Sequence, residues 1–534
     1  MALRSNSSNA RSTGFPERGI EVSSGVPEVE QTTQFAVQEK SKLQRSLRSF
    51  DMVFFTVCAI VGLDVLGTVS TYGPQGFTWL VVLALLFLIP YALVMTELGS
   101  SFTQEGGPYE WVKMTMGRFQ GVVAAVLYWV TNPLWVGGSL AFVATDAWSA
   151  HIHEIGSGYT FGNIVFKLAF IWFSIGVAIV SLRRGKWIPN VGAFARVLVL
   201  GTFTVTVVIY GIEHGLHTPA IGDFRPTAAT FIGLVPLLLF AFVGFELQNG
   251  AAEEMENPSR DVPISILRSG SLAVLLYAIP IFGILLVLPL DQVTSIGGFL
   301  DAVTETFSVY GGAQDFMVDV MVLGFIFALL TSGAVWMMGS DRILAVASLD
   351  GAFPAYFGVF NERFGTPVRV NVMSGIASTV FMLAAVEFLN SGSAAAFVVV
   401  LTIAITTTLL SYLWIFATGI LLRYSHPHVR RPYRLGAAGN GAMWVCTILI
   451  LLWTALGSWV ALFPDTIEKV IGVDYGSFTD YWGVSRAKFE ALTFGTLIVV
   501  VAVAAVGYWL AADTRRQTVD VALPAEGEPL APPT

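Results

Sequence analysis

Long apolar segments constrain this chain more than any other feature. A segment of about 20 apolar residues with few charges can cross a bilayer as a helix. Such segments lack the period-two alternation of membrane barrel strands. They recur twelve times in the 534 residues, at 50–73, 77–101, 117–147, 163–183, 189–212, 228–252, 268–290, 316–347, 370–390, 394–423, 441–463 and 488–511. The sequence therefore predicts an all-α membrane protein with twelve transmembrane helices.

Composition and charge agree with this prediction. Hydrophobic residues make up 54% of the chain and charged residues 12%, whereas a soluble domain carries roughly 25% charged residues. The Lys and Arg residues gather before the first segment and in alternate connections, at Lys40, Lys42, Arg45, Arg48, Lys113, Arg118, 183–186, Arg260, Arg268, Arg342, Arg363, Arg369 and 423–434. Because basic residues favour the cytoplasmic side, we expect a multi-pass protein of the plasma membrane with both termini in the cytoplasm.

The two ends of the chain differ from the rest in composition. Residues 1–40 are rich in Ser, Thr and Gly without an apolar signal stretch, and residues 513–534 are rich in Pro. Both ends are predicted to be disordered cytoplasmic tails. They flank one membrane domain over 41–512, with spans 1–5 at about 50–212, spans 6–10 at about 228–423 and spans 11–12 at about 441–511.

Two of the apolar segments contain matching interruptions. Span 1 reads "AIVGLDVLG" from Ala59 and span 6 reads "AFVGFELQNG" from Ala241, which places Asp64 and Glu246 at corresponding positions. A carboxylate at bilayer depth costs roughly 2.5 kcal/mol or more on insertion scales, and Gly lowers helix propensity by about 1 kcal/mol. Matched interruptions in two halves point to the broken helices of a secondary transporter. The alternative is that the glycines serve only close helix packing.

Several longer motifs resemble one family. "FAFVGFELQNGAAEEMENPSRDVPISILRS" (240–269) resembles span 6 and the following loop in the amino acid–polyamine–organocation superfamily. "FTQEGGPYEWVKMTMGRFQG" (102–121) and "DRILAVASLDGAFP" (341–354) with "NERFGTPV" (361–368) resemble its loops after spans 2 and 8. The resemblance implies a leucine-transporter-like fold with a 5+5 inverted repeat, helices 1 and 6 broken, and substrate held between spans 1, 3, 6 and 8.

The resemblance also implies roles for individual residues. Tyr128 takes the position of an outer gate, Phe240 that of an occluding aromatic, and Glu246 that of an inner gate associated with proton sensing. The implied substrate site comprises Ile60, Gly62, Asp64, Thr131, Asn132, Phe240, Val243 and Trp336. For the aromatic residues, ordinary membrane packing is the alternative interpretation.

Asp64 departs from the family pattern, which has small residues at this break so that backbone amides can bind a substrate carboxylate. A carboxylate here would repel a carboxylate ligand. Asp64 could instead pair with the ammonium of an amine, stay protonated and carry a coupling proton, or point away and bond Ser, Thr or Arg in a neighbouring span. The three alternatives predict different substrates or none.

Arg196 in span 5 matches a lysine that occupies the sodium position in some proton-coupled relatives. Arginine is effectively always charged, so at that position it would exclude sodium and leave proton transfer to Asp64 or Glu246. Thr331 and Ser332 in span 8 argue the other way, because hydroxyls at that place can form a sodium site. A snorkelling Arg196 near the cytoplasmic end is the alternative.

We therefore expect a secondary active transporter of amino acids or related amines that works by alternating access, coupled to protons or to exchange. The alternatives are an organic-amine or polyamine permease selected by Asp64, and a membrane sensor that keeps the fold without transport. Expected partners are a small-molecule substrate, protons and lipid, with a homodimer as one option for assembly. We expect no nucleic acid, cofactor or metal, and no enzymatic activity, because there is no phosphate-binding loop and the six histidines form no cluster.

Overall fold

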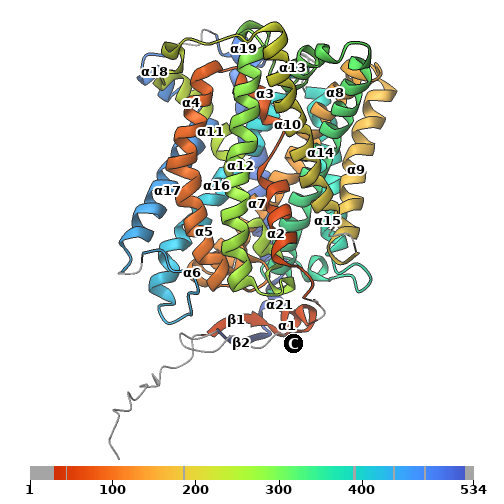
Figure 1. Ribbon diagram of the computed structural model, residues 1–534. Coiled ribbons are helices and arrows are strands. Elements are labelled where there is room, and N and C mark those ends of the chain that lie inside the picture. Colours follow the sequence, from red (N-terminus) through yellow and green to blue (C-terminus); the bar gives the residue numbers. More distant parts are fainter. Residues whose placement is uncertain are drawn as a thin grey trace, which may run out of the picture.

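A bundle of long helices forms the body of the protein (Figure 1). The structure is a computed structural model that describes residues 29–41, 43, 45–184, 187–388, 393–436, 439–473 and 477–523. The first half of the bundle contains α2 (Ser49–Ile60), α3 (Val65–Ser70), α4 (Gly73–Leu83), α5 (Ile89–Ser101), α6 (Gly107–Met116), α7 (Arg118–Trp135), α8 (Ala141–His151), α9 (Phe161–Arg184) and α10 (Trp187–His214). The second half contains α11 (Ala228–Phe242), α12 (Pro258–Val287), α13 (Gly298–Thr306), α14 (Gln314–Leu349), α15 (Val368–Phe388), α16 (Ser393–Ser425), α17 (Gly441–Leu462), α18 (Ile467–Val470), α19 (Phe478–Trp482), α20 (Arg486–Leu510) and α21 (Ala512–Arg515).

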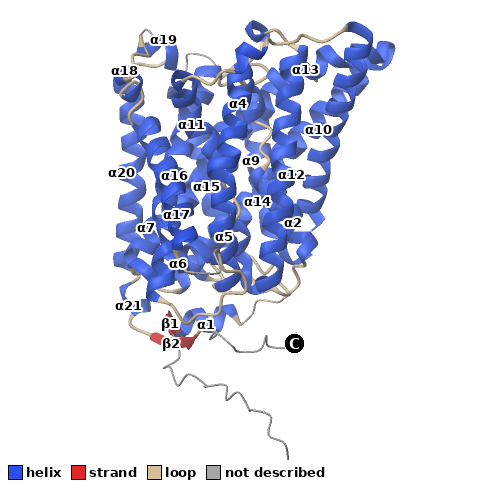
Figure 2. Ribbon diagram, turned by 60° about the vertical axis from the view of Figure 1, so that its left-hand side comes forward, coloured by secondary structure: helices blue, strands red, loops and turns tan. Residues whose placement is uncertain are grey.

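Most of these helices run along one common direction (Figure 2). Two short π-helical turns, Ala84–Leu88 and Val136–Leu140, join α4 to α5 and α7 to α8 into longer rods. Among the described residues, eleven helices are long and apolar enough to cross a membrane. The count is one below the predicted twelve because the first predicted span is divided into short helices, of which α2 is an apolar helix of 12 residues.

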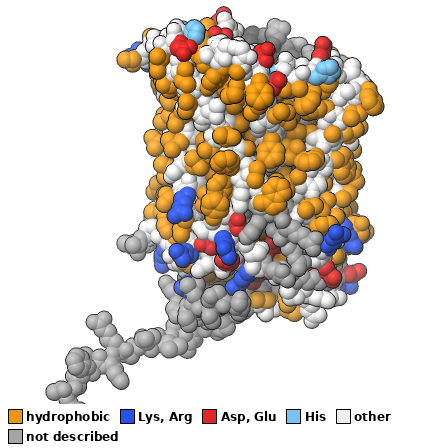
Figure 3. Space-filling model, turned by 45° about the vertical axis from the view of Figure 1, so that its right-hand side comes forward, with side chains coloured by type: hydrophobic (Ala, Val, Ile, Leu, Met, Phe, Trp, Pro, Cys, Tyr) orange, Lys and Arg blue, Asp and Glu red, His pale blue; other side chains and the backbone are white. Residues whose placement is uncertain are grey.

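The surface separates into an apolar belt and two polar ends. Hydrophobic side chains cover the middle of the face seen in Figure 3, and Lys and Arg side chains gather toward the end where β1 (Val29–Thr33) and β2 (Thr518–Ala522) lie in Figure 1. We call this end the terminal face and the opposite end, with α13, α18 and α19, the distal face (Figure 1). Apolar residues on the belt, such as Phe194 and Leu198, are exposed, as expected for side chains that contact lipid.

The two predicted interruptions are breaks in helical structure. The backbone leaves the helical conformation over 61–64 between α2 and α3, and over 243–246 between α11 and a 3₁₀ helix at Leu247–Glu254. Gly244 has a φ of +134°, a conformation that residues with a Cβ rarely adopt. Gly62 and Gly244 therefore lie where the chain departs from a helix.

A small antiparallel sheet joins the two ends of the chain at the terminal face. Strand β1 (Val29–Thr33), which precedes α1 (Gln34–Lys40), pairs with β2 (Thr518–Ala522), and Val29 lies opposite Ala522. The predicted disordered tails, 1–40 and 513–534, thus include ordered segments, because pairing across the whole chain satisfies backbone groups that neither tail could satisfy alone. Their remaining parts, 1–28 and 524–534, lie outside the described residues, as do Lys42 and Lys186.

Candidate functional site

The backbone at the first helix break is hydrogen-bonded by side chains of α12 and α14. Trp336 of α14 donates its indole N–H to the carbonyl of Ala59 at 2.8 Å. The hydroxyl of Tyr277 in α12 donates to the carbonyl of Ile60 at 2.6 Å and accepts the Gly62 N–H at 2.9 Å. Unpaired backbone groups at a buried helix end are costly, so these contacts stabilise the break itself.

The second break is held in a similar way by one tyrosine. The hydroxyl of Tyr91 in α5 accepts the backbone N–H groups of Gly244 and Phe245, each at 2.8 Å. The same hydroxyl donates to Oε2 of Glu246. Each break therefore has a tyrosine whose oxygen accepts backbone N–H groups, Tyr277 at the first and Tyr91 at the second.

Asp64 faces a small cavity between the breaks. It is 2% exposed, and its Oδ2 accepts the indole N–H of Trp135 in α7 at 2.9 Å. Among the described residues, no group donates a hydrogen bond to its Oδ1. Ser139 and Arg196, which belong to neighbouring spans, also interact with this carboxylate, so the alternative in which Asp64 bonds Ser, Thr or Arg of a neighbouring span stays a prediction. A buried carboxylate oxygen without a donor calls for a cation or a proton.

The cavity beside Asp64 is narrow and largely aromatic. It encloses about 20 Å³, little more than the space of one water molecule. The ring of Trp135 packs edge-to-face against Phe240 and against Trp336, with centroids 5.8 and 6.4 Å apart. The aromatic side chains thus enclose Asp64, and a larger ligand requires them to move.

Glu246 lies in a cage of three tyrosine hydroxyls. Its Oε1 accepts from Tyr128 at 2.6 Å and from Tyr412 of α16 at 2.5 Å, while Oε2 accepts from Tyr91. The carboxylate is fully buried. Three hydroxyl donors replace the hydration that burial removes, so the cage ties the second break to α5, α7 and α16.

Arg196 is fully buried beside the first break. Its Nε donates to the carbonyl of Val61 at 3.0 Å, and its two other nitrogens donate to Thr331 at 2.9 Å and to Ser332. Nη2 also donates to the carbonyl of Ala328 at 2.6 Å. The hydroxyl pair that the sequence offered as a sodium site is thus already hydrogen-bonded to a fixed cation.

Buried ion pairs close the terminal face below the breaks. Arg342 of α14 bonds Glu105 at 2.8 Å and also Glu254, and neither its guanidinium nor the Glu105 carboxylate is exposed. Lys113 of α6 bonds Glu30 of β1 at 2.8 Å. Burial raises the pKa of Glu30, but the charges of Lys113 and Lys40 outweigh this and lower it from 4.5 to about 2. The terminal sheet is therefore bound to the bundle by an ionised carboxylate.

Most of the residues that the sequence suggested for a substrate site come together. The cavity is lined by seven of the eight, namely Ile60, Gly62, Asp64, Thr131, Asn132, Phe240 and Trp336. Val243 is buried at the end of α11 but does not line the cavity. Tyr128 and Glu246 contact each other, while Arg196 lies behind the first break.

Four further residues escaped the sequence analysis. Trp135 lies one helical turn after Thr131, so helical spacing in α7 could have identified it. Tyr91, Tyr277 and Tyr412 carry no local signal, because each acts on a break or a carboxylate more than 150 residues away in sequence.

Comparisons with known proteins identify the family. The Amino acid permease family profile matches residues 47–473. A "Probable agmatine/putrescine antiporter" of Lactococcus lactis subsp. lactis is 26% identical over 445 residues, which are 80% of this chain and 93% of that protein. An uncharacterized transporter of Legionella pneumophila is 28% identical over 75% of this chain and 86% of its own, and the branched-chain amino acid permease of Bacillus subtilis is 23% identical over 82% and 93%. The chain therefore belongs to the amino acid permease family and is a multi-pass membrane transporter of amino acids or amines.

Proposed function

We propose that this transporter carries an organic cation, an amine such as agmatine or putrescine, with its ammonium or guanidinium group bound by Asp64. The observation that carries the proposal is the buried Oδ1 of Asp64, which has no hydrogen-bond donor among the described residues and belongs to a side chain that lines the cavity. A cationic group supplies both the donor and the opposite charge, and a charge-assisted hydrogen bond is about twice as strong as a neutral one.

The backbone at the breaks favours a substrate without a carboxylate. The N–H of Gly62 binds Tyr277, and the N–H groups of Gly244 and Phe245 bind Tyr91. These amides are not free to bind an anion, and Asp64 would repel one at close range. The resemblance to a probable agmatine/putrescine antiporter supports this proposal, because both of those amines lack the carboxylate of an amino acid.

Alternating access follows from the symmetry of the breaks. Asp64 and Glu246 stand at corresponding positions, and Tyr277 in the seventh predicted span matches Tyr91 in the second. In a 5+5 inverted repeat, span 2 corresponds to span 7 and span 1 to span 6. The paired tyrosines therefore support this repeat, in which one set of helices rocks against the other around the central cavity.

We further propose that coupling does not use sodium. Arg196 occupies the hydroxyls of Thr331 and Ser332 with a permanent charge. Exchange of one cation for another, or proton binding at Glu246, then provides the coupling. A proton on Glu246 would remove an acceptor position from the tyrosine cage and so loosen the second break. The basic residues at the terminal face support a cytoplasmic location of both termini.

Matched ligand pairs test the proposed substrate class. Agmatine and arginine differ by one carboxylate, as do putrescine and ornithine. The amine of each pair should raise the thermal unfolding midpoint of the purified protein in detergent, and the amino acid should raise it much less. A ligand at a hundred times its dissociation constant stabilises the folded state by about 2.7 kcal/mol.

Asp64→Asn is the matched variant for this experiment. It keeps the shape of the side chain but removes the charge, so the amines should lose their stabilising effect. Asp315→Asn, at an exposed position near the start of α14, should behave as the unmodified protein does. Equal stabilisation by arginine and agmatine, or amine stabilisation that survives in Asp64→Asn, would refute the proposal.

A further inference from the structure

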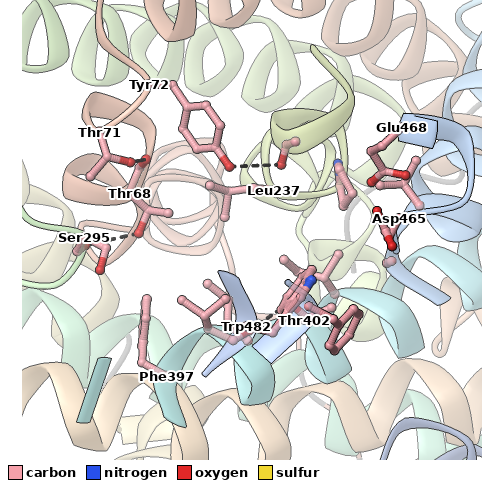
Figure 4. Close-up of a pocket in the computed structure, with 18 of the residues that line it drawn as sticks. Thr68, Thr71, Tyr72, Leu237, Ser295, Phe397, Thr402, Asp465, Glu468 and Trp482 are labelled. Atoms are coloured by element: carbon pink, nitrogen blue, oxygen red, sulfur yellow. Dashed lines mark hydrogen bonds between the residues drawn. The ribbon is translucent and has the colours of Figure 1, made fainter. Parts of the chain in front are cut away.

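A second and larger cavity lies at the distal face. It has a volume of about 390 Å³, within the range of small-molecule sites. Its walls come from α3, α11, α16, α17 and the segments α18 and α19. Figure 4 shows Glu468 and Asp465 on one side of this distal cavity, and Thr68, Thr71 and Ser295 on the other.

The distal cavity lies directly above the central one. On α11, Leu237 lines the distal cavity and Phe240, one turn later, lines the central cavity. At the first break, Asp64 lines the central cavity and Thr68 the distal one. The two cavities therefore lie one helical turn apart along both elements, with the distal cavity nearer the distal face.

Glu468 is the unexplained group in this cavity. Its side chain is 4% exposed, and among the described residues its Oε2 has no hydrogen-bond partner. No ion pair joins it to a described Lys or Arg. A buried carboxyl oxygen without a hydrogen-bond partner is unfavourable in the empty protein, and Oδ1 of Asp64 is a second oxygen of this kind.

The nearby basic residues are engaged elsewhere. Lys469 and Arg486 bind Oδ2 of Asp465 at 2.6 and 2.9 Å. Asp465 thus has two cationic partners, while no ion pair among the described residues joins either cation to Glu468. The side chain of Glu468 is left as a buried carboxyl group at the wall of the cavity.

Most of the remaining wall is apolar. Leu237, Leu401 and Val460 provide hydrocarbon surface, and Phe397, Phe478 and Trp482 provide aromatic surface. A bare metal cation needs several converging ligands, and among the described residues no group of three or more His, Cys, Asp and Glu side chains could hold one. A cationic head on an aliphatic chain satisfies both the carboxylate and the apolar wall, and aromatic rings add a favourable cation–π contribution.

We propose that the distal cavity is a second binding site for organic cations, in which Glu468 binds the ammonium or guanidinium group before transfer to Asp64. The inference rests on the proposed function only in that both sites take the same class of ligand. Threonine hydroxyls opposite Glu468 can accept hydrogen bonds from the second end of a diamine or of agmatine.

Equilibrium binding of radiolabelled agmatine to the purified full-length protein tests this site. We expect two agmatine molecules per chain. Glu468→Gln should weaken agmatine binding at the distal site by roughly ten-fold or more and leave the central site. Asp64→Asn should leave the distal site. The double variant should bind none, whereas Glu468→Asp, which keeps the charge, should retain both sites.

The outcomes separate the two proposals. If the protein binds one agmatine per chain, and Asp64→Asn abolishes this binding while Glu468→Gln does not, the distal site is overturned and the central site is supported. If the protein binds two agmatine molecules and Asp64→Asn removes neither, the proposed function is overturned. The distal site is still supported in that case, provided that Glu468→Gln removes one of the two. No binding would overturn both. Loss of both sites in Glu468→Gln and in Glu468→Asp alike would indicate a folding role for Glu468 and also overturn the inference.

Discussion

Two carboxylates at corresponding residues of the breaks have very different surroundings. Oε1 and Oε2 of Glu246 accept hydrogen bonds from three tyrosines, whereas Oδ2 of Asp64 accepts from Trp135 and its buried Oδ1 has no donor among the described residues. Satisfied buried groups rigidify a structure, and unsatisfied ones create a demand for a ligand. The comparison supports the proposal that Glu246 stabilises the second break and that Asp64 binds the substrate.

The hydrogen bonds of Arg196 predict a transport reaction that is independent of sodium. Its guanidinium already binds Thr331 and Ser332, so sodium has no free hydroxyl pair to bind. Uptake into proteoliposomes should be unchanged when choline replaces sodium in the external medium. A strong requirement for sodium would contradict this role of Arg196.

Removal of the Arg196 side chain should also destabilise the protein. Arg196→Ala removes the side-chain donor of the Val61 carbonyl and one of the donors of the Ala328 carbonyl, which Thr331 still hydrogen-bonds, at a cost of roughly 2–4 kcal/mol. Thermal unfolding in detergent should show a clearly lower midpoint. Arg225→Ala, at an exposed position of a connecting segment, is the control and should have little effect. Equal midpoints for both variants would mean that Arg196 does not support the break.

At the scale of elements, the second break depends on a backbone conformation that favours glycine. Gly244 has a φ of +134°, and a Cβ there would lie 3.2 Å from Trp336 and 3.3 Å from Ile60. Gly244→Ala should therefore destabilise the folded protein by roughly 1–3 kcal/mol through backbone strain. It should also displace Trp336 and Ile60, which line the central cavity. Thermal unfolding and amine binding measure the two effects.

Gly201→Ala is the matched control for this element. Gly201 lies inside α10, and a Cβ there would meet nothing within 4 Å. The change should be neutral or slightly stabilising because Ala favours the helix. If Gly244→Ala kept the stability and amine affinity of the Gly201→Ala variant, the strained break would not be needed for binding.

Sequence reasoning succeeded where a signal is local to one element. Hydropathy located the spans, and the repeated interruption placed Asp64 and Glu246 at the two breaks. The tyrosines that hydrogen-bond the backbone at the breaks were not predictable from a local signal. Tyr277 is 215 residues from Gly62, and Tyr91 is 153 residues from Gly244, so no periodic pattern joins them.

At the scale of the whole molecule, the terminal sheet joins the chain ends to the closed terminal face. Neither tail has the composition of a strand that would fold alone, which is why the sequence predicted disorder. The structure adds the buried ion pair between Glu30 and Lys113 and the hydrogen bond from Thr33 to the carbonyl of Leu349 at 2.6 Å. The sheet is thus positioned to hold α6 and α14 together.

This attachment predicts a pH dependence. The pKa of Glu30 is lowered from 4.5 to about 2, so its stabilising effect is complete above 4.5 and is lost as the pH falls toward 2. Spin labels at Gln31→Cys and Asp520→Cys, which are register partners, should stay in close dipolar contact from pH 5 to 8 and separate in acid.

Glu30→Gln should weaken the same contact at neutral pH. Glu256→Gln is the control, because its pair with Arg48 is exposed and such pairs contribute little. Spin labels that remain together in Glu30→Gln and in acid would show that the ion pair does not hold the sheet.

The central claim is that Asp64 selects and carries an organic cation through this molecule. The most direct measurement is uptake of radiolabelled agmatine into proteoliposomes loaded with unlabelled agmatine, for the unmodified protein and for Asp64→Asn. We predict rapid uptake that excess putrescine inhibits and excess arginine does not, and a loss of at least roughly ten-fold in Asp64→Asn. Agmatine uptake at the same rate in Asp64→Asn, or binding without any uptake in the unmodified protein, would contradict the claim.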